Sequence, residues 1–409
     1  MPEPVENLPP PEGPVGVKRP PPASAAPAGS GAGDPPQAGG NGDPKAAPEA
    51  PPAPPKLEPL RSVHTASFPQ ILEQLGLSVL VTTYQAGRLV ALRADGGVLN
   101  THFRGFAKPM GLAVQGHRFA VGLAFEICEF HDMPAVARKL DPPGKHDACF
   151  LPRLVHNTGD IQIHEMAWVG NELWFANTAF SCLCSRSDTF SFRPRWRPPF
   201  VSHLAPEDRC HLNGLAAIDG QIRYVTALGE TNTKGGWRAN KRDGGILMEF
   251  PSGRIIGRGL SMPHSPRWHD GRLWLLESGT GSIGTFDLAA GRYHPIAELP
   301  GFTRGLSFHG PLAFIGLSQV RESAVFSGIP LVERLKERTC GVWVVDTRNG
   351  QTVAFVRFED AVQEIFAVEV LPGMRYPDVI NDNVQLLATS YVLPDDALAD
   401  VPETLRARA

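Results

Sequence analysis

Short runs of apolar residues dominate the chain from about residue 62 onwards. Gly, Pro, Asn and Asp interrupt these runs at short intervals, a pattern that is typical of β-strands joined by tight turns. Only two segments, residues 69–75 and 330–338, have the apolar spacing of helices. Because neither alternates with strands in a strand–helix–strand order, the pattern disfavours a parallel α/β fold and predicts an all-β fold.

A unit made of a strand, a tight polar turn and a second strand recurs along the chain at intervals of 40 to 60 residues. This interval matches one four-stranded blade of a β-propeller. When the units are aligned on their common apolar pattern, their first residues are Met110, His164, Asn213, His264, Arg304 and Glu364. The sequence therefore predicts a six-bladed β-propeller.

The two ends of the repeat region complement each other. Residues 78–83, 88–93 and 98–103 are predicted strands without an inner strand of their own, whereas the unit at residue 364 has an inner strand without partners. We expect these N-terminal strands to pair with the C-terminal inner strand, which closes the ring and removes exposed sheet edges. A seventh blade stays open as an alternative if residues 384–392 add more sheet.

The composition divides the chain into three parts. Residues 1–60 contain 19 of the 40 prolines and no Phe, Trp or Tyr, so they cannot bury enough apolar surface to offset the entropy lost on ordering. We therefore predict a disordered Pro/Ala/Gly-rich tail over residues 1–60, a propeller domain over 61–392 and a C-terminal tail over 393–409. The Pro-rich tail is a candidate binding segment for protein partners.

Charge and cysteine content exclude several classes of partner. The tail holds four basic and seven acidic residues, which accounts for the whole net charge of −3, so the remainder is formally neutral. A neutral body argues against nucleic-acid binding. The chain has no apolar run of about 18 residues, which argues against membrane insertion. The start of the chain lacks a signal-peptide pattern and the six cysteines form no disulfide framework, so we expect a cytoplasmic protein.

Four short segments resemble a known family. They are residues 82–88 (TTYQAGR), 236–238 (GWR) followed by two glycines at 244–245, 340–346 (CGVWVVD) and 362–366 (VQEIF). They resemble a bacterial family of conserved hypothetical proteins that looks like a propeller of unknown function, and the resemblance covers roughly residues 62–380. It implies no established activity. More distantly, the architecture is similar to the six-bladed gluconolactonase and strictosidine-synthase group, whose shared calcium motif is not found here.

The repeat alignment predicts a polar site. In a propeller, the loop before each inner strand and the loop between the second and third strands lie on the same face, so the six aligned residues would ring the mouth of the central channel. Two imidazoles and a carboxylate, from His164, His264 and Glu364, would suit one divalent transition metal such as Fe(II), Zn(II) or Mn(II) better than calcium. His211 replaces His264 if the alignment slips in that repeat. The alternative is a water-filled channel with solvated polar walls.

A second set of residues would bind a ligand beside this metal. Asn213 and Arg304 belong to the ring itself, and a long loop over residues 229–245 could cover the mouth with Trp237 as a stacking surface. An arginine beside an aromatic ring suits an anionic ligand. The remaining candidates lie on loops between second and third strands and are Tyr84, Gln85, Asn177, Glu230, Asn232, Arg238 and Lys241.

Three classes of function follow from these predictions. The first is a metal-dependent hydrolase or oxygenase that acts on a polar small molecule at the channel mouth. A metal-bound water would attack an ester or lactone, whereas iron would allow oxygen chemistry. The second is a non-catalytic module that binds a glycan or peptide at the same mouth. The third is a scaffold that binds protein partners through its blade edges and its Pro-rich tail.

Overall fold

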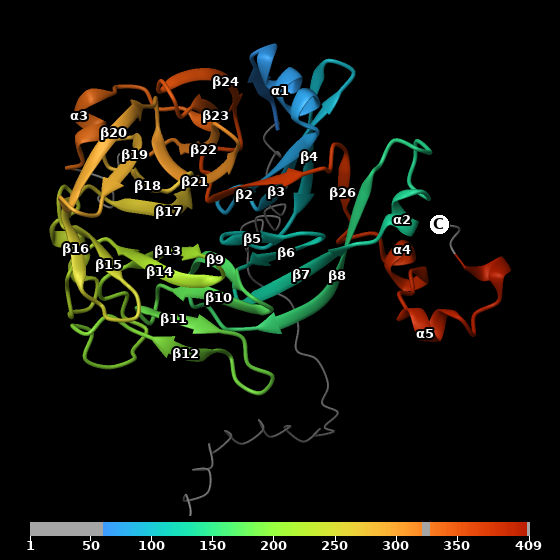
Figure 1. Cartoon of the computed structure of the whole chain (residues 1–409), viewed down its shortest axis with the longest axis horizontal. Coiled ribbons are helices and arrows are strands. Elements are labelled where there is room, and N and C mark those ends of the chain that lie inside the picture. The colour runs from blue at the N-terminus through green and yellow to red at the C-terminus, as the bar shows by residue number, and fades with distance from the viewer. Residues whose placement is uncertain (1–59, 321–327, 407–409) are drawn as a thin grey trace, which may run out of the picture. The chain divides into compact units, whose positions relative to one another are not determined.

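Six small sheets surround a common axis, and one strand of each sheet, β25, β5, β9, β13, β17 or β21, is innermost (Figure 1). The computed structural model describes residues 60–320 and 328–406. Contacts between the inner strands of neighbouring sheets run from each sheet to the next and return to the first, so the ring is closed. The prediction of a six-bladed β-propeller is confirmed.

The blades are numbered here in chain order. Blade 1 contains β25 (Ala367–Pro372), β2 (Leu77–Thr83), β3 (Arg88–Asp95) and β4 (Val98–Gly105). Blade 2 contains β5 (Leu112–Gln115), β6 (Arg118–Gly122), β7 (Glu126–Asp132), β8 (Ala148–Asn157) and β26 (Pro377–Val379). Blade 3 contains β9 (Ile163–Val169), β10 (Glu172–Asn177), β11 (Cys182–Ser185) and β12 (Arg193–Trp196).

The other three blades follow the same order from the channel outwards. Blade 4 contains β13 (Leu212–Ile218), β14 (Gln221–Ala227), β15 (Gly245–Glu249) and β16 (Ile255–Leu260). Blade 5 contains β17 (Pro263–His269), β18 (Arg272–Glu277), β19 (Ser282–Asp287) and β20 (Arg292–Glu298). Blade 6 contains β21 (Phe302–His309), β22 (Leu312–Ser318), β23 (Cys340–Asp346), β24 (Gln351–Phe358) and β1 (Ser62–His64).

Segments from the two ends of the described chain close the ring. The inner strand β25 pairs antiparallel with β2, from Leu77 opposite Pro372 to Thr82 opposite Ala367. This is the predicted closure, and β2, β3 and β4 match the three expected N-terminal strands within two residues at each end. In addition, β1 pairs with the outer strand of blade 6 and β26 runs parallel to the outer strand of blade 2.

Glycines at the start of inner strands let neighbouring blades approach closely. A Cβ atom at Gly111 would lie 2.0 Å from the carbonyl oxygen of His164, and one at Gly305, where φ is +80°, would lie 2.6 Å from the backbone nitrogen of Val368. Any side chain would push the inner strands apart. This close approach explains why a glycine recurs directly after the first residue of three of the aligned repeats.

The apolar core lies between adjacent sheets rather than within the channel. Between blades 5 and 6, for example, Trp274 and Leu276 pack against Leu306, Ile315 and Trp343. Such layers remove the apolar faces of each blade from water, which is the main term that stabilises a fold built from repeats.

The helices are short and lie outside the blades. They are α1 (Ser67–Leu75), α2 (Pro134–Ala137), α3 (Pro330–Arg334), α4 (Val384–Thr389), α5 (Asp395–Leu398) and the 3₁₀ turns η1 (Gly236–Ala239) and η2 (Glu403–Leu405). The predicted helix over 330–338 ends earlier, because Leu335 has an extended backbone. No helix within the described ranges is long and apolar enough to cross a membrane.

Two sequence predictions concern the chain ends. Residues 384–392 add no sheet, because α4 occupies most of this segment, so the seven-bladed alternative is wrong. Asn383 caps α4 by accepting a hydrogen bond from the backbone N–H of Leu386, which is typical of a helix start. The predicted disordered tail over residues 1–60 lies outside the described residues, apart from Leu60.

Candidate functional site

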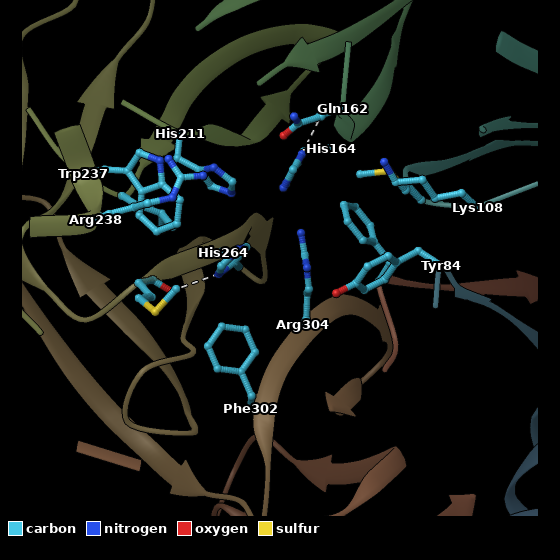
Figure 2. Close-up of a pocket in the computed structure, with 14 residues that line it drawn as sticks. Tyr84, Lys108, Gln162, His164, His211, Trp237, Arg238, His264, Phe302 and Arg304 are labelled. Atoms are coloured by element: carbon cyan, nitrogen blue, oxygen red, sulfur yellow. Dashed lines mark hydrogen bonds between the residues drawn. The ribbon is translucent and has the colours of Figure 1, made fainter. Parts of the chain in front are cut away.

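A cavity of about 210 Å³ lies at one mouth of the central channel and is lined by residues from all six blades or the loops that lead into them. Of the residues predicted to form a site, six line this cavity: Tyr84, His164, Trp237, Arg238, His264 and Arg304. In Figure 2, the side chain of Arg304 points toward His164, with His264 to one side of it. We call this cavity the mouth pocket.

Hydrogen bonds between neighbouring blades determine the position of each inner strand along the channel axis. A Ser or Thr near the end of one blade's second strand donates its hydroxyl hydrogen to a backbone carbonyl at the start of the next blade's inner strand. The four bonds are Thr82 to Met110 at 2.6 Å, Thr178 to Leu212 at 2.6 Å, Ser278 to Thr303 at 2.5 Å and Ser318 to Ile365 at 3.0 Å. Asn213 makes the corresponding bond from its amide to the carbonyl of Pro263, at 2.9 Å.

These bonds relate five of the six repeats, all except the one that begins at His164. The residue that follows each accepting carbonyl occupies the same position in its blade, which confirms the alignment for His264, Asn213 and Arg304. In blade 2 the bond is shifted by one residue, because its acceptor is the carbonyl of Met110 itself, whereas in the last unit Phe366 follows the acceptor, two residues after Glu364. Two residues, Ile365 and Phe366, separate Glu364 from the start of β25. Glu364 therefore precedes the position that the aligned residues of the other blades occupy at the channel mouth.

Four of the lining residues hold an unusual backbone conformation. Lys108, Gln162, His211 and Met262 have φ between +49° and +53°, the left-handed region that non-glycine residues rarely adopt. They come from four consecutive blades, and each stands two residues before Met110, His164, Asn213 or His264. Such strain costs about 1–3 kcal/mol at each residue. The surrounding fold therefore keeps these residues at the mouth pocket in a conformation that costs stability. Strained backbone of this kind is found often at functional sites.

The two predicted histidines are fixed in the same way. Nδ1 of His164 lies 2.9 Å from the carbonyl oxygen of Gln162 and 2.8 Å from the hydroxyl of Thr178. Nδ1 of His264 lies 2.9 Å from the carbonyl oxygen of Met262 and 2.9 Å from the hydroxyl of Ser278. Burial, and then the neighbouring His211 and Arg304, hold the pKa of both imidazoles well below 6.5. Both rings are therefore neutral at pH 7.

Arg304 is the charged group at the centre of the mouth pocket. Its guanidinium stacks on the ring of Phe366 at 3.7 Å and lies 5.9 Å from the ring of Tyr84. Within residues 60–320 and 328–406, no carboxylate lies within 4 Å of this guanidinium and no group accepts a hydrogen bond from it. Burial lowers the pKa of Arg304, which nevertheless remains charged at every physiological pH.

Asp208 organises the wall formed by blade 4. Its Oδ1 accepts a hydrogen bond from Nδ1 of His211 at 2.9 Å, and its Oδ2 accepts from the indole N–H of Trp237 at 2.9 Å and from Arg238 at 3.1 Å. Trp237 is buried and its ring lies 4.5 Å from that of His211. Trp237 therefore forms a fixed wall, and the loop expected to cover the mouth is anchored by this carboxylate.

The pairing of Asp208 with His211 has a chemical consequence. A carboxylate on Nδ1 orients an imidazole and stabilises the imidazolium that forms when Nε2 accepts a proton. His211 lines the mouth pocket beside His164, at 4.8 Å between ring centroids. The pocket can therefore combine anion recognition at Arg304 with proton transfer at His211.

The predicted ligand Glu364 lies in a small neighbouring cavity that shares Tyr84 and Arg304 with the mouth pocket. Burial, together with the nearby Glu364 carboxylate, raises the pKa of Tyr84 to about 12. Among the residues that the structure describes, no three His, Cys, Asp or Glu side chains are grouped so that they could hold a metal ion. The metal formed by His164, His264 and Glu364 stays a prediction.

The structure places the remaining predicted ligand residues away from the mouth pocket. Asn213 is buried below it, where Thr226 donates to its side-chain oxygen at 2.8 Å. Asn177 is buried at the end of β10 and accepts a hydrogen bond from the backbone N–H of Phe180. The other four do not line the pocket either: Gln85, which accepts from the backbone N–H of Gln363, Glu230, which pairs with Arg258, Asn232, which accepts from Arg209, and Lys241.

Several lining residues were not predicted from the sequence, chiefly Lys108, Gln162, Met262, Phe302 and Phe366. His211 was predicted only as a substitute for His264, whereas both line the pocket. A signal was present for four repeats, because Lys108, Gln162, His211 and Met262 each stand two positions before the first aligned residue and line the mouth pocket.

Below the mouth pocket, charged groups from three inner strands meet. Arg267 on β17 contacts Glu165 on β9 at 2.5 Å and Glu369 on β25 at 3.2 Å. Ser307 on β21 donates to the other oxygen of Glu369 at 3.1 Å. Burial, and next the neighbouring Glu165, raise the pKa of Glu369 to about 7, although Arg267 opposes this shift. We call these side chains the channel ion cluster.

The fold and the pocket together define the class of the protein, a six-bladed β-propeller with a polar pocket at one channel mouth. Residues 66–380 match the sequence profile of a domain of unknown function, DUF4915. Because the match spans more than half of the chain, the chain belongs to this family. No curated protein matches the sequence.

Three solved structures share only low similarity with the chain. One is from a nidogen/laminin complex, at 10% identity, with 73% of this chain and 100% of that chain covered and a TM-score of 0.47. A protein of unknown function from Bacteroides caccae has 8% identity, 72% and 99% coverage and a TM-score of 0.46. The computationally designed Ika8 protein has 11% identity, 71% and 74% coverage and a TM-score of 0.33.

Proposed function

We propose that the mouth pocket binds a small anionic molecule, a carboxylate or a phosphate monoester, with Arg304 as its charged partner. The observation that carries this proposal is the guanidinium of Arg304, which stacks on Phe366 and has no carboxylate partner in the described part of the chain. The Arg304 side chain lines the mouth pocket, so its guanidinium is accessible to a ligand there. An anionic ligand that accepts two parallel hydrogen bonds from the guanidinium would supply that partner.

The charge of the whole lining supports the same proposal. Among the residues that the structure describes, Lys108 and Arg238 also line the mouth pocket, whereas no Asp or Glu does. Lys108 lies 3.9 Å from Asp160 and Arg238 lies 3.1 Å from Asp208, so both have carboxylate partners outside the pocket. Of the three described cations, Arg304 is therefore the one without a carboxylate partner. The metal-dependent hydrolase or oxygenase, the glycan- or peptide-binding module and the protein scaffold stay predictions.

The test is a titration of the full chain with butyrate and with butyl phosphate, followed by ligand-observed NMR. We expect at least one of the two anions to bind, and Arg304→Met to weaken this binding at least about tenfold, since a charge-assisted hydrogen bond contributes about 1.5–3 kcal/mol. Arg118→Met is the matched control, because Arg118 also stacks on an aromatic ring, that of Trp168 at 3.7 Å, outside the pocket. Equal affinity of the Arg304→Met variant, or no binding of either anion, would overturn the proposal.

A second function is favoured by the pairing of Asp208 with His211. His211 could act as a general base that takes a proton from the carbon next to a bound carboxylate, while Arg304 stabilises the charge that develops on the carboxylate oxygens. Incubation of carboxylic acids with the protein in D₂O tests this directly, because return of a deuteron to that carbon removes a ¹H NMR signal. Exchange at the buffer rate, or equal exchange with His211→Gln, would exclude this function.

A further inference from the structure

The hydrogen bonds around His164 determine which ring nitrogen carries the proton. A carbonyl oxygen can only accept, so Nδ1 of His164 must donate to the carbonyl of Gln162. Thr178 does not compete for the donor role, because its hydroxyl hydrogen is directed to the carbonyl of Leu212 at 2.6 Å. The proton of the neutral ring is therefore on Nδ1, and Nε2 has a free lone pair.

His264 has the same arrangement two blades further on. Its Nδ1 faces the carbonyl of Met262, and Ser278, which also contacts Nδ1, donates its own hydrogen to the carbonyl of Thr303 at 2.5 Å. In both blades the hydroxyl residue stands 14 positions after the histidine. In both blades, a backbone carbonyl two residues before the histidine thus keeps the ring proton on Nδ1.

Both Nε2 atoms are acceptors without a donor. In the described residues every hydrogen bond of His164 and His264 is made by Nδ1. The low pKa of both rings agrees with lone pairs on Nε2 instead of N–H groups. Both residues are largely buried, at 4% and 5% exposure, and both line the mouth pocket, so a ligand there can reach each Nε2 lone pair.

The mouth pocket therefore makes two different demands on a ligand. Arg304, which points toward His164 in Figure 2, requires an anionic acceptor. His164 and His264 each require an O–H or N–H donor. A simple aliphatic carboxylate accepts hydrogen bonds from Arg304 but donates none to the two imidazoles. Aromatic walls from Trp237, Phe302 and Phe366 would cover the apolar carbons that connect these groups.

We propose that the ligand is a small hydroxy acid or hydroxyalkyl phosphate, in which hydroxyl groups close to the anion donate to Nε2 of His164 and of His264. This inference rests on the proposed function, because it assigns the anion to Arg304. It adds the chemical feature that distinguishes the ligand from other small anions, the hydroxyl donors.

The experiment compares anions that differ only in hydroxyl number. The full chain is titrated with butyrate, 3-hydroxybutyrate and 3,4-dihydroxybutyrate, and in a second arm with propyl phosphate and glycerol 3-phosphate. We expect affinity to rise about two- to tenfold with each hydroxyl. The arm with the tighter ligand identifies the anion as a carboxylate or a phosphate.

Two variants assign the effect to the imidazoles. His164→Phe and His264→Phe keep an aromatic ring and remove the acceptor, so we expect the ratio of affinities between 3-hydroxybutyrate and butyrate to fall in each variant, whatever its affinity for butyrate. The matched control is His269→Phe, because His269 stacks on Phe308 outside the pocket. Binding of all anions in a series with equal affinity would overturn this inference and leave the proposed function intact, whereas no binding in either arm would overturn both. Circular dichroism of each variant checks that it is folded.

Discussion

The channel ion cluster makes the stability of the propeller depend on pH in a definite direction. Glu369 shares Arg267 with Glu165, and burial raises its pKa from 4.5 to about 7. A carboxyl group whose pKa is raised by folding binds its proton more tightly in the folded state. Its contribution to stability is therefore complete below about pH 4 and is lost as the pH rises through about 7.

The magnitude follows from this shift. A tenfold change in an equilibrium constant corresponds to about 1.4 kcal/mol, so a pKa raised from 4.5 to about 7 corresponds to about 3 kcal/mol. Replacement of Glu369 by Gln removes this ionisation and keeps a group of the same shape. We expect Glu369→Gln to gain about 3 kcal/mol relative to the wild type between pH 4 and pH 8.

The assay is urea unfolding of both proteins at pH 4, 6 and 8, followed by tryptophan fluorescence. Only the difference between the two proteins is interpreted, because other titrating groups cancel in it. Glu73→Gln on the exposed side of α1 is the control, and its difference from the wild type should not change with pH. A difference for Glu369→Gln that is independent of pH, or that favours the wild type at pH 8, would refute the reasoning.

Three further substitutions test other parts of the fold by thermal or urea unfolding. Asp208→Asn should cost about 1–3 kcal/mol and shift the fluorescence of Trp237, because an amide cannot accept all the hydrogen bonds that the carboxylate accepts. Ser278→Ala should cost about 1–3 kcal/mol, because it leaves the carbonyl of Thr303 without its donor between blades 5 and 6. Phe314→Ala should cost about 3–5 kcal/mol, because the side chain is fully buried between blades.

Each of these substitutions has an exposed counterpart of the same chemistry: Asp270→Asn, Ser252→Ala and Phe190→Ala. We expect these controls to change the free energy of unfolding by less than about 0.5 kcal/mol. A buried variant that matches its exposed control would show that the contact assigned to it does not stabilise the fold.

The sequence predicts the fold because the repeat is local. A strand, a turn and a second strand can be recognised within about a dozen residues, and the closure of β25 on β2 follows from the unmatched ends. The alignment fails at Glu364 for a physical reason. The contact that defines the equivalent position is a hydrogen bond from Ser318 in the preceding blade to the carbonyl of Ile365, and an apolar pattern within one unit carries no information about it.

The candidate site is predicted in part for the same reason. His164, His264 and Arg304 could be found because each occupies the same place in its own repeat. The partners of the charged residues could not, since they lie far away in the sequence, within the same blade or in another one. Glu230 pairs outwards with Arg258, and Glu165 meets Arg267 across 102 positions of sequence.

The hydrogen bonds that join the blades also determine the chemistry of the mouth pocket. The hydroxyl of Thr178 holds Nδ1 of His164 and at the same time bonds to the inner strand of blade 4, and Ser278 does the same for His264 and blade 6. If neighbouring blades shifted relative to each other, these hydrogen bonds would break and the ring proton would no longer be held on Nδ1. Ser278→Ala should then reduce the preference for hydroxylated anions as well as stability, although Ser278 itself does not line the mouth pocket. An unchanged preference in this variant would show that the contact between the blades does not determine the tautomer of His264. The carbonyl of Met262 would then be sufficient to keep the proton on Nδ1.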